Sequence, residues 1–203
     1  MKIHHSQPFF GPSDRRGLGN VLSRGFVSTG PLSERFGTAA AKVLGKAWGI
    51  PLQSGTDALT AALALMGVKE GAKVAVPAYV CSAPLDSIAF FKAQPVPVDV
   101  DLETLAVCPE RIGAGRGFSA VIGAHLFGIP APLGRIRHRG LIEDCAQTLL
   151  AKDEDGRTVG KSGRLSTCSF YATKLLTTGH GGLLAGDDPE LRAEAMRLFL
   201  HDK

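Results

Sequence analysis

The chain has 203 residues, of which 44% are hydrophobic, and it contains 25 glycines and 12 prolines. This length suits one large domain and is short for two full-sized ones. The apolar content supplies a core that needs neither metal nor disulfide. The 23 Lys and Arg residues against 19 Asp and Glu give a net charge of +4 that is spread along the chain. Such a balance fits a small anionic ligand and is a poor footprint for nucleic acid.

The cysteines and the amino terminus bear on the cellular compartment. The cysteines lie far apart, without a Cys-x-x-Cys pair, at Cys81, Cys108, Cys145 and Cys168. This spacing indicates neither a zinc site nor a redox dithiol, and small buried thiols are typical of a reducing compartment. Met1–Phe10 holds two histidines and a proline where a secretory signal would be apolar, and no apolar run reaches about 18 residues. We therefore expect a cytoplasmic protein that binds neither a membrane nor a metal.

The amino-terminal quarter differs in pattern from the rest. Residues 1–50 are rich in Gly, Ser, Pro and Arg with weak periodicity, so we expect an irregular arm that leads into one helix over Leu32–Leu44. Strong helix formers then run over Thr56–Met66, with Ser54 or Thr56 as a cap and Gly67 as a stop. This second helix is apolar nearly all round, which predicts that it is buried.

Short apolar runs bounded by turn residues predict strands in the remainder of the chain. They lie at Lys73–Val76, Pro95–Val98, Ser119–Ala124 and Leu141–Glu143. Helices are expected at Ala83–Lys92 and Leu191–His201. The alternation predicts the α/β class, with a mostly parallel sheet covered on both faces. Because such sheets bind ligands at the carboxyl ends of their strands, functional residues should follow the strands directly.

Three segments at these expected strand ends carry chemistry. Ser54-Gly55-Thr56 opens the buried helix, whose first N–H groups suit a phosphate, although a turn with a cap fits the same residues. An apolar strand runs into Glu143 and Asp144, which equally suit a helix N-cap cluster. The third segment contains Lys174, whose amine would attack a carbonyl if desolvated. A lysine beside leucines more often lays its stem on apolar surface and keeps its amine in water.

Two histidines and an arginine series have simple structural interpretations. His125 follows a buried strand and is expected to bond to backbone rather than to act in catalysis. His180, among glycines after Lys174, is interpreted as a turn residue. The alternating arginines are expected in an exposed edge or loop, at Arg135, Arg137 and Arg139.

The order of these motifs resembles that of the DegT/DnrJ/StrS family of pyridoxal-phosphate (PLP)-dependent sugar aminotransferases. The amino-terminal match is Gly25–Pro31. The further matches begin at Ser54 (Ser-Gly-Thr-x-Ala-Leu), Val76 (Val-Pro-Ala-Tyr), His125 (His-Leu-Phe-Gly), Ile142 (Ile-Glu-Asp-x-Ala-Gln), Ser169 (Ser-Phe-Tyr-Ala-Thr-Lys) and Gly179 (Gly-His-Gly-Gly). The resemblance implies the three-layer α/β/α large domain of these transferases, with residues 51–203 as the PLP-binding part.

The resemblance also implies site residues. Lys174 is similar to the lysine that forms a Schiff base with PLP and moves a proton during the reaction. Asp144 is similar to the carboxylate that keeps the pyridine nitrogen protonated. Gln147, one helical turn further on, would lie near the ring hydroxyl. The phosphate would be held by Gly55, Thr56 and Ser169.

The implied reaction moves an amino group, usually from glutamate, to a keto sugar carried on a nucleotide, as in polysaccharide biosynthesis. The family also implies a homodimer. A truncated, inactive relative that still binds the cofactor or a partner is an alternative. A PLP-dependent sugar dehydratase is another, but that branch has a histidine in place of the Schiff-base lysine, so Lys174 argues against it.

The sequence departs from the family pattern in three places. The chain ends at Lys203, whereas family members continue into a small carboxyl-terminal domain. Pro132–Leu141 is shorter than the usual crossover helix. Cys81 stands where an aromatic ring commonly stacks on the cofactor, so stacking comes from Tyr79 or is absent.

Overall fold

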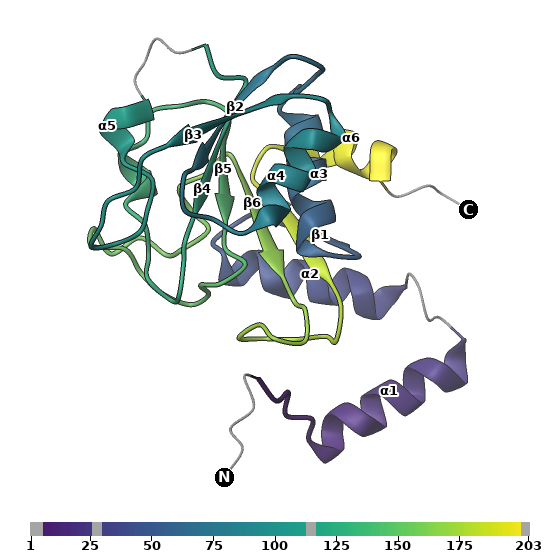
Figure 1. Ribbon diagram of the computed structural model, residues 1–203. Helices are drawn as coiled ribbons and strands as arrows, with labels where there is room; N and C mark the ends of the chain where they lie inside the picture. The colour runs from purple at the N-terminus through teal and green to yellow at the C-terminus, as the bar shows by residue number, and fades with distance from the viewer. Residues whose placement is uncertain (1–5, 26–29, 113–116, 200–203) are drawn as a thin grey trace.

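The computed structural model describes residues 6–25, 30–112 and 117–199. Its centre is a seven-stranded sheet in the order β1-β7-β6-β5-β4-β2-β3 (Figure 1). The strands are β1 (Trp48–Leu52), β2 (Lys73–Pro77), β3 (Gln94–Val98), β4 (Ala120–Ala124), β5 (Leu141–Asp144), β6 (Leu165–Ser169) and β7 (Gly182–Gly186). Strands β2 to β6 are parallel, and β7 is antiparallel to both of its neighbours, β1 and β6. The expected α/β class with a mostly parallel sheet is confirmed.

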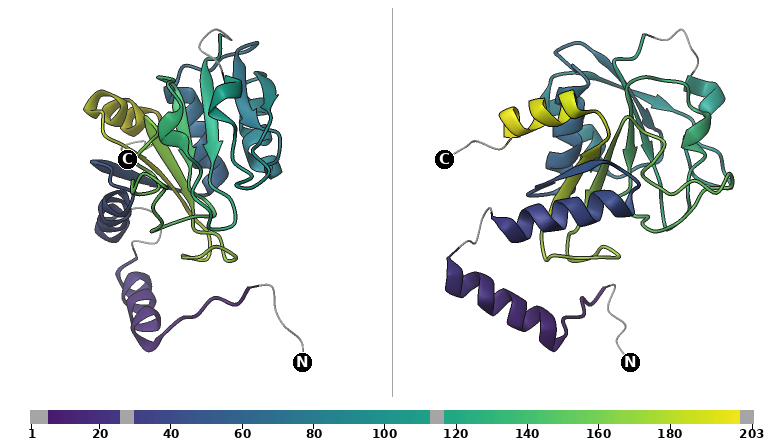
Figure 2. Two further views of the ribbon diagram at one scale, coloured as in Figure 1. Left: turned by 90° about the vertical axis from the view of Figure 1, so that its left-hand side faces the viewer. Right: turned by 180° about the vertical axis from the view of Figure 1, so that it is seen from behind.

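Helical segments cover both faces of this sheet (Figure 2). They are α1 (Pro12–Arg24), α2 (Pro31–Val43), α3 (Gly55–Leu65), α4 (Ser82–Phe90), α5 (Pro109–Ile112), the 3-10 turn η1 (Leu133–Arg135) and α6 (Pro189–Phe199). One core cluster joins α3, α4 and α6 to one face of the sheet. A second cluster joins α2 to the other face, over β6 and β7, and a third packs α5 and η1 over β2 and β4. The chain therefore forms the three layers that were expected.

Helix α3 carries the start of the candidate site and is held firmly in the core. Ser54 caps it, because its Oγ accepts a hydrogen bond of 3.0 Å from the N–H of Asp57. Six of its residues are buried, Ala58, Leu59, Ala61, Ala62, Leu63 and Leu65. Burial of one leucine side chain stabilises a fold by about 1.5–3 kcal/mol. The prediction of a buried helix is confirmed, and of the two expected caps Ser54 is the one that forms.

The expectation of an irregular arm before Leu32 is wrong, because α1 lies there. Its start has Pro12 in the first turn and a hydrogen bond of 2.8 Å from the N–H of Gly11 to Asp14 Oδ2. Its end is Gly25, in the left-handed conformation with φ of 75°. None of its residues is buried, and it lies away from the sheet in Figures 1 and 2. The sequence signal for this helix is a short apolar stripe of Leu18, Val21 and Leu22, set among Gly, Ser and Arg residues that favour an irregular segment.

Three further expectations concern the boundary after residue 50, the crossover after β4 and the ends of the chain. The expected boundary between residues 50 and 51 falls inside β1. The crossover after β4 contains only η1, in line with the short Pro132–Leu141 segment. Most of the Gly25–Pro31 match and His201 lie outside the described residues.

The burial of the cysteines and the character of the helices bear on the expected compartment. Cys145 and Cys168 are buried, but Cys81 is exposed and Cys108 is half-buried, so the expectation of buried thiols holds for two of the four. Among the described helices, none combines the length and the apolar character that crossing a bilayer requires.

Candidate active site

A cavity of about 240 Å³ lies at the carboxyl edge of the parallel strands, where ligands were expected. Its walls come from the starts of α3 and α4, from the residues that end β5 and β6, and from the connection between β6 and β7. Five of the seven predicted site residues line it, namely Gly55, Thr56, Asp144, Ser169 and Lys174. The fold thus brings together residues that lie more than a hundred positions apart in the chain.

One end of the cavity is formed by the first turn of α3. The N–H groups of Asp57 and Ala58 donate to Ser54, whereas those of Gly55 and Thr56 have no protein acceptor in the described part of the chain. A Cβ on Gly55 would lie only 2.7 Å from the Cβ of Ser169, so the serine stands directly against the helix start. Free N–H groups at the positive end of a helix, next to a hydroxyl, form a site for an anion.

Another wall of the cavity is formed by Asp144, the last residue of β5. Its side chain is 7% exposed, and Oδ1 accepts a hydrogen bond of 2.9 Å from the N–H of Ala146. Burial raises the pKa of this carboxyl, and the Ala146 bond and the charge of Lys174 oppose the rise only in part. A buried carboxylate with this environment favours a partner that brings a proton or a positive charge.

Lys174 is half-buried and lies in the turn after β6, where its N–H donates to the Tyr171 carbonyl at 2.9 Å. It lines the cavity, while its neighbours Leu175 and Leu176 are exposed. Its charge is felt by Asp144, whose pKa it lowers. The lysine therefore brings an amine into the same cavity as the carboxyl group.

The two remaining predicted residues do not line the cavity. Tyr79 is half-exposed, with its ring centroid 6.3 Å from that of Phe127. Gln147 Oε1 accepts a hydrogen bond of 3.4 Å from the N–H of Phe127. The residues that follow β5 form a turn, so the expected helical turn to Gln147 and the helix N-cap alternative for Glu143 and Asp144 are both wrong. Cys81, at the start of α4, does line the cavity.

The sequence interpretation missed His180, which lines the cavity. Its Nδ1–H donates to the Gln53 carbonyl at 2.5 Å, and its ring meets that of Tyr171 edge-on at 5.8 Å between centroids. A histidine among glycines resembles any polar turn residue in sequence. Only the pairing of β1 with β7 brings it beside Gln53, and its place in the glycine motif after Lys174 was the available signal.

A buried network lies behind Asp144. His125 Nε2 donates to Glu143 Oε1 at 2.8 Å, and its Nδ1 accepts a bond of 2.8 Å from the N–H of Ala131. The carboxylate also accepts backbone N–H bonds of 2.7 Å each from Gly160, Ser162 and Gly163. Burial raises the pKa of Glu143, but the bonds from His125 and the backbone outweigh it and leave the pKa below its ordinary value.

The same network contains a group of potential metal ligands, His125, Glu143 and Cys145, within 4.8 Å of one another. Both ring nitrogens of His125 are engaged, and the two oxygens of Glu143 already accept four hydrogen bonds. These atoms therefore have no free position for an ion, and the group is a structural network.

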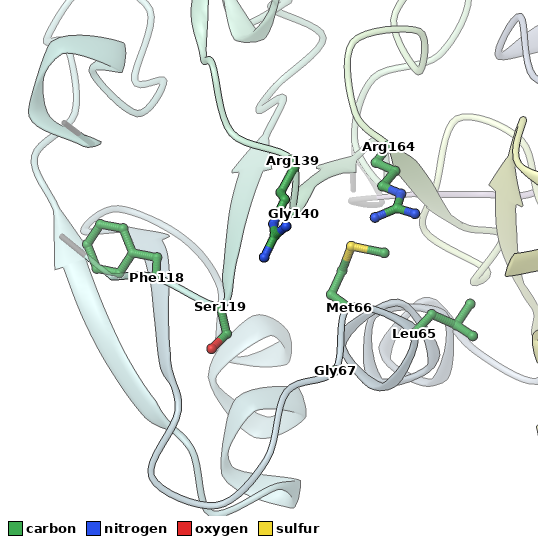
Figure 3. Close-up of a pocket in the computed structure, with 8 residues that line it drawn as sticks. All are labelled: Leu65, Met66, Gly67, Phe118, Ser119, Arg139, Gly140 and Arg164. Atoms are coloured by element: carbon green, nitrogen blue, oxygen red, sulfur yellow. The ribbon is translucent and has the colours of Figure 1, made fainter. Parts of the chain in front are cut away.

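A second cavity of about 360 Å³ lies at the opposite, amino edge of the strands (Figure 3). Arg139 and Arg164 extend into it beside Met66, at the carboxyl end of α3. Cations are favoured at this end of a helix, and Arg164 also bonds to Asp188 at 3.1 Å. None of the predicted site residues lines this cavity. The exposure of Arg139, like that of Arg135 and Arg137, confirms the expected exposed arginine series.

Comparison with known proteins places these features in a family context. Residues 11–202 match the model of the DegT/DnrJ/EryC1/StrS aminotransferase family. The structure is similar to the aminotransferase TlmJ from Streptoalloteichus hindustanus, with 32% identity, a TM-score of 0.86, and coverage of 97% of this chain and 56% of that one. It is also similar to a DegT DnrJ EryC1 StrS aminotransferase from Brucella abortus, with 30% identity, a TM-score of 0.84, and coverage of 92% and 54%.

A third similar structure is the PLP form of Spr1654 from Streptococcus pneumoniae, with 23% identity and a TM-score of 0.89. The match covers 99% of this chain and 58% of that one, and at this identity it supports the fold alone. The chain thus spans just over half the length of these solved structures.

Proposed function

Because the chain belongs to the DegT/DnrJ/EryC1/StrS aminotransferase family, we propose that it provides the PLP-binding part of a sugar aminotransferase. The observation that carries this proposal is the convergence of Lys174, Asp144 and the first turn of α3 on one cavity. These three elements are an amine, a buried carboxyl group and an anion site. The proposed PLP-binding part, residues 51–203, contains all of them.

The first turn of α3 fits the phosphate of PLP. Gly55 and Thr56 offer N–H groups, and Ser169 offers a hydroxyl beside them. The missing Cβ at Gly55 leaves the helix start and the serine in contact, which a larger residue would push apart. These residues would bind the phosphate without a lysine or arginine in the turn itself.

Asp144 fits the pyridine nitrogen of PLP. Burial raises its pKa, so a protonated ring nitrogen would share its proton strongly with this carboxyl group. When bound, PLP supplies an aldehyde that condenses with amines and a protonated ring that withdraws electrons from the neighbouring carbon. The role of Asp144 is to hold the proton at that ring nitrogen.

Lys174 would hold the cofactor through its Nζ and then act as the proton carrier of the reaction. In its neutral form, Nζ would accept a proton from the α-carbon of an amino donor. It would then return this proton to the carbon that comes from the aldehyde group of PLP. The half-buried position limits access of water to the amine. Ser169 would hold the phosphate of the cofactor and Asp144 its ring nitrogen, in the same cavity as this amine.

The substrate and assembly proposals rest on the family. We propose glutamate as the amino donor and a nucleotide-linked keto sugar as the acceptor. The net charge of +4 suits such an anionic substrate. Gln147, in the turn after β5, would contact the hydroxyl group of the cofactor ring. Tyr79, half-exposed beside Phe127, would stack on that ring. Assembly as a homodimer and a cytoplasmic location complete the proposal.

The test is an absorption spectrum of the purified chain mixed with PLP. The wild type should develop a visible band that Lys174→Ala abolishes. Lys69→Ala, which removes an exposed lysine outside the cavity, should keep the band. Absence of a band from the wild type would overturn the proposal.

Glutamate separates turnover from binding in the same experiment. Addition of glutamate should bleach the band of the wild type as the amino group passes to the cofactor. A band that forms normally and resists glutamate would identify the chain as a cofactor-binding module, which is the inactive alternative.

A further inference from the structure

We propose that His180 supplies the positive charge that binds the cofactor phosphate, an inference that rests on the proposed function. The phosphate of PLP carries up to two negative charges, whereas the first turn of α3 offers only partial charges. Two groups in the described lining of the cavity can become cationic, Lys174 and His180. Lys174 is committed to the aldehyde end, so His180 is the remaining source of charge.

Backbone pairing places His180 beside the phosphate site. Leu52 pairs with Gly182 in the β1–β7 ladder, so the residues just after β1 meet those just before β7. A Cβ on Gly182 would lie 2.0 Å from the Ser54 carbonyl oxygen and 2.8 Å from the Gly55 nitrogen. The glycine turn that carries His180 therefore lies in direct contact with the start of α3.

The hydrogen bond to Gln53 occupies one ring nitrogen of His180 and leaves the other one available to a ligand. A carbonyl only accepts, so Nδ1 of His180 carries its hydrogen and donates to Gln53 at 2.5 Å. The ring is held from a second side by the edge contact with Tyr171. Nε2 has no hydrogen-bond partner among the residues that the structure describes, and on protonation it becomes an N–H donor to an anion.

The charged groups around His180 define the expected pH dependence. Asp57 belongs to the first turn of α3, and Asp144 and Lys174 line the same cavity as His180. Tyr171 contributes a neutral ring edge. A phosphate in the cavity adds the largest negative charge. Binding of PLP should therefore draw a proton onto His180, and the phosphate contribution should weaken as imidazoles lose their charge, above about pH 8.

Two substitutions separate the charge of His180 from its structural hydrogen bond to Gln53. His180→Asn places an amide N–H near Nδ1, which keeps the Gln53 bond and removes the charge. His180→Gln places a neutral amide near Nε2 and gives up the Gln53 bond. Binding of pyridoxal and of PLP is each followed by the visible band. The quantity compared between variants is the ratio of the two dissociation constants, pyridoxal over PLP. Pyridoxal lacks the phosphate, so the ratio isolates the phosphate contribution and cancels effects on the Lys174 amine.

At about pH 6.5, the ratio of the pyridoxal dissociation constant to the PLP dissociation constant should be about ten- to hundredfold larger for the wild type than for His180→Asn. This difference should shrink at about pH 8.5, and His180→Gln should retain part of the preference through its neutral N–H. Equal ratios for the wild type and His180→Asn at both pH values would overturn the inference while leaving the proposed function standing. If both variants lose affinity for pyridoxal and for PLP by the same factor, His180 only supports the structure of the site, and the inference is overturned as well. A wild type without any band would instead defeat the proposed function, and the inference with it.

Discussion

His125 and Glu143 form a buried pair in which the imidazole Nε2 donates to the carboxylate Oε1 at 2.8 Å. The two side chains are only 2% and 1% exposed. Because the N–H of Ala131 donates to Nδ1, the histidine is the neutral tautomer with its hydrogen on Nε2. The pair joins the end of β4 to β5 one residue before Asp144, so it sets where the Asp144 carboxyl group lies.

Glu143→Gln should destabilise the chain by about 3 kcal/mol or more, measured by urea unfolding at pH 7. The amide would face backbone N–H donors with an NH₂ group, leaving buried donors without acceptors. Glu154→Gln is the control, because Glu154 pairs with Arg135 at the surface and its loss should cost below about 1 kcal/mol. Equal losses for the two variants would contradict this account of the network.

The contribution of Glu143 should also depend on pH. Its pKa is lower in the folded chain than the ordinary value of 4.5, so the folded state favours the ionised form. The stabilisation is complete above the unfolded pKa and is lost as the pH falls through the folded one. The stability gap between the wild type and Glu143→Gln should therefore narrow on acidification below about pH 4.5, as urea titrations at several pH values would show.

Asp144→Asn should stabilise the cofactor-free chain at neutral pH while weakening PLP binding. Burial raises the pKa of Asp144, so the folded state holds an ionised carboxylate at a cost that a neutral amide avoids. We expect a gain of about 1 kcal/mol in thermal unfolding without PLP, typical of replacing a strained active-site group. The gain should shrink as the pH falls through the raised pKa of the folded state and vanish below 3.8, the ordinary Asp value, where the carboxyl group is protonated in both states. A variant less stable than the wild type at pH 7 would contradict this.

Gly55→Ala and Gly182→Ala test the close approach at the phosphate site. The Cβ at Gly55 would meet the Ser169 side chain at 2.7 Å, and that at Gly182 would meet the Ser54 carbonyl oxygen at 2.0 Å. Both should destabilise by about 1–3 kcal/mol, with Gly182→Ala the worse because backbone must move. Gly17→Ala in α1 has open space around it and should be neutral or slightly stabilising. Calorimetry of the three variants checks the ranking.

Replacement of Leu18 and Leu22 in α1 by Ala should leave unfolding unchanged within about 0.5 kcal/mol. Both leucines are exposed, and no residue of α1 is buried. The urea midpoint of the double variant measures this directly. A loss of more than about 1 kcal/mol would show that α1 packs on the sheet in solution.

The core of the fold was predictable because its elements show strong local patterns. The apolar run of α3 and the short strands between glycines and prolines predicted the α/β class and the edge of the sheet that holds the site. Strand β1 was not predicted, because Gly49 and Pro51 interrupt it. Both are explained by tertiary contacts, since a Cβ at Gly49 would lie 2.5 Å from the Gly37 carbonyl oxygen of α2, and β1 is an edge strand that tolerates proline.

The candidate site divides in the same way. Asp144, Lys174 and the start of α3 were identified because strand ends and motif order point to them. His180 was missed because its significance comes from a partner strand that no local pattern reveals. Tyr79 illustrates the opposite case, since the family resemblance offered it as a stacking residue, yet its ring lies with Phe127 and Tyr79 is not among the residues that line the cavity.

The contact between Gln53 and His180 joins positions 127 residues apart, and the β1–β7 ladder beside it spans a similar distance. During synthesis, β1 therefore waits without a partner until most of the chain has left the ribosome. Contacts of such long range slow folding, and an unpaired strand edge invites association with other chains. Substitutions that weaken β7 should accordingly lower the yield of folded protein more than their effect on equilibrium stability suggests.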